Sequence, residues 1–152
     1  MSRVSLDANV LFSSAISEGG ASRGIFELAD QYPGVVDLIV SERAIKEALV
    51  NLQRKRQASV GELLILLDGL QFAPEPPEAL TDRLRDHVSD PKDVPILAGA
   101  VWAEADLLVT GNSRHFGHLY GIHVGGCLIL PPREAVSVLL SEAGGGPGRS
   151  SP

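Results

Sequence analysis

The stretch VSLDANVLF, at residues 4–12, leads from an apolar run straight into an acid. Short runs rich in leucine and β-branched residues are typical of buried strands in parallel sheets, and such sheets bind their ligands beyond the carboxyl ends of the strands. Asp7 stands at that end. Its carboxylate can cap the following turn, with help from Asn9, or it can belong to a functional site. Acids or amides at the ends of other strands would favour the second role.

Length and composition predict one globular domain. The chain has 152 residues, of which 44% are apolar, and this is enough for an adequate core. We place the domain at residues 1–142. The segment 143–152 is rich in Gly, Ser and Pro, cannot bury anything and is expected to be disordered.

Several function classes are disfavoured by the same composition. No apolar run approaches the roughly 20 residues of a membrane span and no signal region opens the chain, so we expect a cytoplasmic protein without membrane contact. The net charge of −6 argues against broad electrostatic adhesion to nucleic acid, so a polyanionic substrate would need metal ions or a local basic patch. The single cysteine, Cys127, lies in an apolar run, which favours an inert, packed thiol over a nucleophile.

Segments with strand and helix periodicity alternate along the chain. Ser41 is well placed to cap a helix, and the Ser- and Gly-rich residues 13–22 are expected to form a loop. The alternation predicts an α/β fold, a three-layer α/β/α sandwich with a central, mostly parallel sheet. Further strands are expected at 35–40, 71–73, 106–110 and 127–130, the last at a sheet edge, and helices at 24–30, 42–52 (buried face Ile45, Leu49, Leu52), 63–70, 93–101 and 132–140 (Val136, Leu139, Leu140).

A second informative stretch, residues 90–101, places two acids at the start of a helix of small residues. Asp90 and Asp93 would lie near the positive end of the helix dipole, where carboxylates commonly act as caps. Capping is favoured for Asp90, while capping and metal ligation both stay open for Asp93. Polar groups also follow the strand at 106–110, where Thr110 leads into a turn that contains Asn112.

These polar groups are expected to share one rim of the sheet with Asp7, because the carboxyl ends of parallel strands lie together. Glu47, in the helix at 42–52, can point along the sheet edge toward Asp7, and a solvated glutamate is the alternative. Mg²⁺ and Mn²⁺ prefer oxygen ligands, and crowded acids are costly unless a metal ion lies among them. A bound ion would polarise a phosphodiester and activate a water, so the pattern indicates nuclease chemistry.

Four motifs follow one another along the chain: Asp7-Ala-Asn, Glu47 in a helix, Asp93 before Ile-Leu-Ala-Gly-Ala, and Leu-Val-Thr-Gly-Asn. This ordered set resembles the PIN-domain ribonucleases, and most closely their VapC-like toxin branch. The resemblance runs from about Val4 to about Leu140. It implies a PIN-like fold and a Mg²⁺- or Mn²⁺-dependent endoribonuclease, commonly a homodimeric toxin that a cognate antitoxin neutralises. Carried over by position, Asp7, Glu47 and Asp93 would hold the metal, and Asn112 would orient metal or water.

One position departs from the family. Many members have an acid before Phe, three residues after Asn112, and this chain has His115 before Phe116. Loss of a fourth carboxylate would weaken metal binding, which leaves open a catalytically impaired PIN-like module that binds RNA or protein. Phosphoryl transfer through an aspartyl nucleophile at Asp7 is less favoured, because Asn9 stands where a second Asp is usual.

Contacts with RNA are predicted for Asn9, Thr110, Arg114 and His115, which lie at the same strand ends. A zinc site is not expected, because the histidines form no close helical pair and no pair of cysteines exists. Residues 63–70 contain more leucines than one narrow apolar stripe of a helix can accommodate. The additional leucines favour a homodimer contact at this helix.

Overall fold

The computed structural model describes residues 2–145 and contains a six-stranded sheet in the order β3-β2-β1-β4-β6-β5. Neighbouring strands are parallel except β5 and β6, which are antiparallel. The predicted mostly parallel sheet is confirmed. In chain order, the strands are β1 (Ser2–Leu6), β2 (Val36–Ser41), β3 (Gln71–Ala73), β4 (Leu107–Val109), β5 (His123–Val124) and β6 (Cys127–Leu130).

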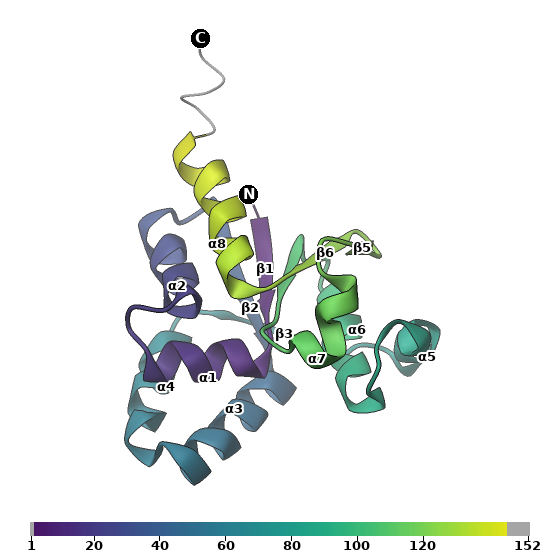
Figure 1. The fold of residues 1–152 in the computed structure, drawn as a ribbon, viewed down its shortest axis with the longest axis horizontal. Coiled ribbons are helices and arrows are strands. Elements are labelled where there is room, and N and C mark those ends of the chain that lie inside the picture. The colour runs from purple at the N-terminus through teal and green to yellow at the C-terminus, as the bar shows by residue number, and fades with distance from the viewer. Residues whose placement is uncertain (1, 146–152) are drawn as a thin grey trace.

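Helices cover both faces of the sheet and complete the predicted three layers (Figure 1). Within residues 2–145, none of them is both long and apolar enough to cross a membrane. On one face lie α1 (Ala8–Ile16), α2 (Ala21–Gln31), α3 (Glu42–Lys55), α4 (Val60–Leu67) and α8 (Pro132–Leu140), and on the other α5 (Glu78–Leu84), α6 (Val94–Trp102) and α7 (Ser113–Phe116). The shorter turns are η1 (Gln57–Ser59), η2 (Arg85–His87), η3 (Pro91–Asp93), η4 (Gly117–Leu119) and the π-helical η5 (Ser141–Gly145).

Two hydrophobic cores follow from the alternation of side chains along each strand. On β4, Leu107 and Val109 pack in the core shared with α1 and α3, while Leu108 packs in the core on the α6 side. Strands buried on both faces need apolar residues at almost every position, and for this reason they stand out in the sequence as continuous apolar runs. The polar residues that follow such strands therefore begin where the sheet ends.

Residues 13–22 are not all a loop, and this expectation was wrong. Helix α1 continues through Ile16 and α2 begins at Ala21, so only residues 17–20 connect them. Ser14 fits inside α1 because its buried hydroxyl donates to the carbonyl oxygen of Val10 at 2.8 Å. A serine that bonds back to its own helix in this way costs little, so serine content was a misleading signal of a loop here.

The strand β6 does not lie at the sheet edge, contrary to the prediction. The two residues of β5 pair outside it, through a turn in which Gly125 and Gly126 have φ angles of 57° and 85°. Two left-handed residues in succession match the tight turns of β-hairpins. At Gly125 a Cβ atom would lie 2.7 Å from Val101 Cγ1, so a side chain has no room there. A two-residue strand is too short to leave a periodic pattern.

Helix α3 begins as predicted. The hydroxyl of Ser41 accepts a hydrogen bond from the backbone N–H of Ala44 at 3.0 Å, which confirms the cap. The fully buried residues of α3 are Ala44, Ala48 and Leu52, and the other two residues predicted for its buried face are only half-buried. Small alanines on this face allow α3 to pack closely against helix α1.

The C-terminal helix differs from the prediction at one residue. Leu139 is buried as expected, but Leu140 is 49% exposed, and Ala135 is the other fully buried residue of α8. The π-helical turn η5 continues the helix into the segment that was expected to be disordered at 143–152. The rest of that segment, residues 146–152, lies outside the described part of the chain.

Cys127 is a buried, unpaired cysteine. Burial, with a smaller effect from the negative charge of Asp106, raises the pKa of its thiol to about 12. Because the thiolate is the nucleophilic form, this environment keeps Cys127 inert, as predicted.

Candidate active site

Asp7 lies where β1 ends and α1 begins, and its side chain is only 4% exposed. One carboxylate oxygen, Oδ1, accepts a hydrogen bond from Ala8 N at 2.7 Å. The other, Oδ2, accepts from Thr110 Oγ1 at 2.8 Å and from Asn9 Nδ2 at 3.1 Å. Burial raises the pKa of Asp7, these hydrogen bonds lower it and the negative charge of Asp93 raises it. Asp7 thus caps α1 and also faces the end of β4.

Asn9 and Thr110 tie the ends of β1 and β4 together. Asn9 Oδ1 accepts from the backbone N–H of Gly111 at 2.6 Å, and a Cβ atom on that glycine would approach Oδ1 to 3.2 Å. Thr110 Oγ1 accepts from Asn112 N at 3.1 Å while it donates to Asp7. The polar atoms of Asn9 and Thr110 therefore hold Asp7 and the following turn in place, and their contact with substrate stays a prediction.

Tyr120 supports the same turn. Its hydroxyl donates to the carbonyl oxygen of Thr110 at 2.8 Å. Burial raises its pKa, and the negative charges of Asp7 and Glu134 raise it further. The sequence analysis missed Tyr120, because a lone aromatic residue beyond the motif carries no recognisable spacing.

Glu47 projects from α3 with an exposed side chain. Its pKa is raised by partial desolvation and then by the negative charges of Asp7 and Asp93, while Lys92 lowers it. The three predicted metal ligands come from separate elements and still act on one another electrostatically. Lys92, an exposed cation beside them, was missed, although its position between two candidate acids was a signal in the sequence.

Asp90, Asp93 and His115 form the closest group of possible ligands in the described residues, with ligand atoms all within 4.8 Å of one another. Asp90 caps η3 by accepting a hydrogen bond from Lys92 N at 3.0 Å, and capping is the role that the sequence favoured for it. Asp93 stands at the N-cap position of α6 without a side-chain capping bond, and its Oδ2 lies 2.6 Å from His115 Nδ1. Nε2 of the same ring lies 4.0 Å from Asp90 Oδ2. Capping therefore does not account for Asp93.

Asn112 caps α7 and orients His115. Its Oδ1 accepts from His115 N at 3.2 Å, and its Nδ2 lies 3.2 Å from the ring nitrogen Nδ1. The predicted role of Asn112 toward metal or water stays a prediction. Arg114 is exposed on the same short helix. His118 turns elsewhere, with Nε2 2.6 Å from the carbonyl oxygen of His87.

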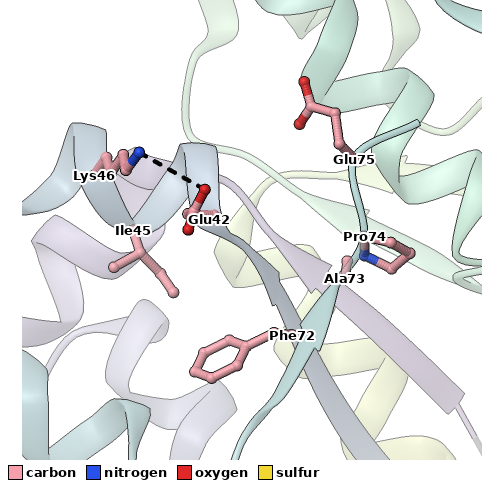
Figure 2. Close-up of a pocket in the computed structure, with 7 residues that line it drawn as sticks. All are labelled: Glu42, Ile45, Lys46, Phe72, Ala73, Pro74 and Glu75. Atoms are coloured by element: carbon pink, nitrogen blue, oxygen red, sulfur yellow. Dashed lines mark ion pairs between the residues drawn. The ribbon is translucent and has the colours of Figure 1, made fainter. Parts of the chain in front are cut away.

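A cavity of about 610 Å³ lies apart from these acids, between the start of α3 and β3 (Figure 2). Phe72 is 66% exposed, and its ring extends into the space below Ile45, with the Glu42–Lys46 ion pair of 3.7 Å above it. The lining residues are Glu42, Ile45, Lys46, Phe72, Ala73, Pro74 and Glu75. None of them is a predicted ligand, so the candidate chemistry lies at the acids and the cavity is a separate surface beside an edge strand.

The donor set fits a divalent cation. The negative charge of Asp93 raises the pKa of Asp7, and the charges of Asp7 and Asp93 raise the pKa of Glu47, so the cluster holds negative charge that a cation would stabilise. Asp90 and His115 add an oxygen and a nitrogen beside Asp93. Carboxylate and imidazole groups are both common ligands of divalent metals in proteins.

The profile of the PIN domain matches residues 3–114, which include Asp7, Glu47, Asp93 and Asn112. The chain therefore belongs to the PIN-domain family. His115 lies just beyond the matched residues.

Among solved structures, the fold is similar to a chain in the crystal structure of VapBC2 from Rickettsia felis bound to a DNA fragment from their promoter, with a TM-score of 0.65. The identity is 16%, over 85% of this chain and 98% of that one, so the similarity is one of fold. The resemblance to the PIN-domain family and the α/β fold that it implied are confirmed. No curated protein matches this chain in sequence.

Proposed function

We infer that this protein is an endoribonuclease that depends on Mg²⁺ or Mn²⁺ and acts as the toxin of a toxin–antitoxin pair. The observation that carries the inference is the cluster of Asp7, Glu47 and Asp93, whose charges act on one another at the carboxyl edge of a parallel sheet. Membership of the PIN-domain family and the similarity to VapBC2 support it.

In this proposal Asp7, Glu47 and Asp93 would hold the ion. When bound, it supplies a Lewis acid for a phosphodiester oxygen and lowers the pKa of a water. Hydrogen bonds from Thr110 and Asn9 fix the position and the rotation of the Asp7 carboxylate. Preorganised groups of this kind need little rearrangement during the reaction.

The exposed cations beside the acids are suited to RNA phosphates. The net charge of −6 gives the surface no general attraction for a polyanion. Lys92 on η3 and Arg114 on α7 are both exposed, and Lys92 is close enough to affect the pKa of Glu47. Local cations of this kind would place a phosphate beside the acid cluster.

The test is cleavage of single-stranded RNA by the full chain with Mg²⁺ or Mn²⁺, repeated in EDTA. Cleavage should require the ion, should vanish in Asp7→Asn and should persist in Asp68→Asn, where the exposed carboxylate lies on the loop after α4. Tight RNA binding without cleavage under any ion would favour the second candidate, an impaired binding module. His115 in the place of a family acid is the observation that favours that candidate.

A homodimer is part of the proposal. Helix α4 buries Leu63 and Leu67 but leaves Leu64 54% and Ile65 70% exposed. Apolar side chains exposed together are typical of a contact surface. Light scattering should show a dimer for the wild type and a monomer for Ile65→Ser, and a wild-type monomer at high concentration would remove the dimer from the proposal.

The cognate antitoxin is the other partner. It should cover an apolar groove with a helix and bring a basic side chain to the acid cluster. Co-expression with the antitoxin should suppress cleavage, and suppression should weaken when that basic residue is replaced by alanine.

A further inference from the structure

We propose that the free edge of β3 binds an extended peptide segment of a protein partner, in which apolar and acidic side chains alternate. The segment would add a strand to the sheet beside β3. The inference does not rest on the proposed nuclease activity, and it uses none of the residues proposed for the metal ion or for the homodimer.

The strand β3 lies at one end of the sheet, and its outer edge is open. It pairs with β2 alone, and in the described part of the chain no backbone group outside β2 bonds to its main chain. An edge strand leaves alternate N–H and C=O groups unpaired, and these groups can pair with another strand. Charged side chains protect many exposed edges, but the three residues of β3 carry no charge. Pro74, which has no N–H, limits the pairing to this short strand.

Successive residues of β3 face opposite sides of the sheet. Phe72 lies beside Val40, which packs in the core on the α3 side. Gln71 lies beside Ile39, which packs in the core on the α6 side. A strand added beside β3 would alternate in the same way, with one side chain toward α3 and the next toward α6. Sites that bind extended peptides typically offer pockets to alternate side chains, and β3 borders a cavity on each face.

The cavity on the α3 side suits an apolar side chain. The ring of Phe72 extends into it and is 66% exposed (Figure 2). The charged side chains around the ring already have partners, since Lys46 pairs with Glu42. Glu75 likewise pairs with Arg43. An apolar side chain of the partner would therefore cover Phe72 without separating a charge from its counterion.

The cavity on the α6 side suits an acidic side chain. It measures about 270 Å³, and its lining includes Arg3 and the half-exposed Trp102. The guanidinium of Arg3 donates from Nη1 to the carbonyl oxygen of Ala103 at 2.9 Å, and its buried Nε has no hydrogen-bond partner. Asp106 accepts from the backbone N–H of Arg3 instead, and Arg3 makes no ion pair among the described residues. A carboxylate in this cavity would supply the charge that this cation lacks.

The same features disfavour two other occupants of this edge. A second copy of the chain that paired through its own β3 would bring no acid to Arg3, because β3 contains none. RNA would bring its phosphates toward the carboxylates of Glu42, Glu75 and Glu104, which line the two cavities. A peptide with one acidic side chain between two apolar ones matches both cavities.

NMR titration of the ¹⁵N-labelled full chain with the peptide acetyl-Thr-Leu-Glu-Leu-Thr-amide tests the proposal. In an extended chain the two leucines share one face and the glutamate points to the other. The amide resonances of β3 should shift until they saturate, and nuclear Overhauser contacts should join a leucine methyl group to the ring of Phe72. The same peptide with lysine in place of glutamate should bind at least about tenfold more weakly, because it brings a cation to Arg3.

Variants at exposed positions test the two cavities without disturbing the core. Phe72→Ser should weaken binding at least about fivefold through the loss of apolar contact. Ile122→Ser is the matched control, because it removes a 47% exposed apolar side chain next to β5, at the other end of the sheet, and should leave the affinity unchanged. Glu104→Gln should strengthen binding about two- to threefold, because it removes a like charge from the cavity that receives the glutamate.

Three results would overturn the proposal. The first is the absence of a saturable shift in β3 at about 5 mM peptide, where even a millimolar complex is mostly formed. The second is equal affinity for the glutamate and lysine peptides. The third is a shift of the same resonances with oligoadenylate in EDTA, or with protein concentration alone, while the peptide has no effect. That result would assign the edge to RNA or to a second copy of the chain.

Discussion

The two halves of the acid site hold the same chemical group in different ways. Asp7 is 4% exposed and accepts three hydrogen bonds from residues at the ends of β1 and β4. The Asp93 side chain is 20% exposed and contacts a histidine from a short helix. The half around Asp7 is therefore fixed by the sheet, while the half around Asp93 depends on η3 and α7, where this chain departs from its family. Substitutions in the fixed half should therefore have the largest effects on activity.

The largest effect should come from Asp7→Asn. Removing a residue that hydrogen-bonds to a metal ligand typically lowers metal affinity or activity about 10–100-fold. Removing a ligand itself should therefore reduce RNA cleavage by more than about 100-fold. The metal-free fold should be as stable or more so, because removal of the buried charge beside Asp93 outweighs the hydrogen bonds from Thr110 and Asn9 that an amide nitrogen in the place of Oδ2 cannot accept. Urea denaturation in EDTA checks the second part, and an unfolded variant would mean that Asp7 is a structural cap.

The next largest effect should come from Thr110→Val, which removes the hydroxyl that orients Asp7 and accepts from Asn112 N. Cleavage or divalent-ion affinity should fall about 10–100-fold while the fold is retained. Thr81→Val is the matched control, because it makes the same change on α5. If both variants lost activity equally, the hydroxyl of Thr110 would not be the cause.

A smaller effect should appear in the pH dependence of stability. The pKa values of Asp7 and Glu47 are raised above their ordinary values of 3.8 and 4.5. An acid whose pKa is raised by folding contributes stability that is complete below its unfolded pKa and is lost as the pH rises through its folded pKa. In EDTA, the wild type should therefore lose more stability than Glu47→Gln between about pH 4 and neutral pH.

Urea midpoints at several pH values measure that difference. Added divalent ions should reduce it, because they stabilise the ionised acids. Glu18→Gln, on the loop between α1 and α2, should follow the wild-type curve. Identical curves for the wild type and Glu47→Gln would show that Glu47 does not belong to the cluster.

The smallest effect on catalysis should come from Arg114→Ala. Its exposed guanidinium is suited to an RNA phosphate, so its loss should weaken RNA binding and reduce the slope of log affinity against log salt by about 1. The rate at saturating RNA should change little. Arg54→Ala, at the end of α3, is the control and should leave the salt slope unchanged.

The sequence predicted the half of the site that depends on the sheet. Asp7 and Thr110 stand directly after buried strands, and parallel strands bring such ends together by topology alone. The contact between His115 and Asp93 was not predictable, because it spans 22 residues and depends on how α7 turns after its cap. Strand β5 was missed for another reason, since two residues carry no periodicity.

The hydrogen bond between Asp7 and Thr110 joins residues 103 positions apart in the chain. During synthesis, at about 5–20 residues per second, Asp7 emerges several seconds before its partner exists. A nascent chain that has not reached β4 therefore lacks the group that orients its first acid. We expect a ribosome-bound chain to become able to cut RNA only after β4 has docked beside β1. A toxin built on this sheet would thus spare the ribosome that is producing it for most of its own synthesis.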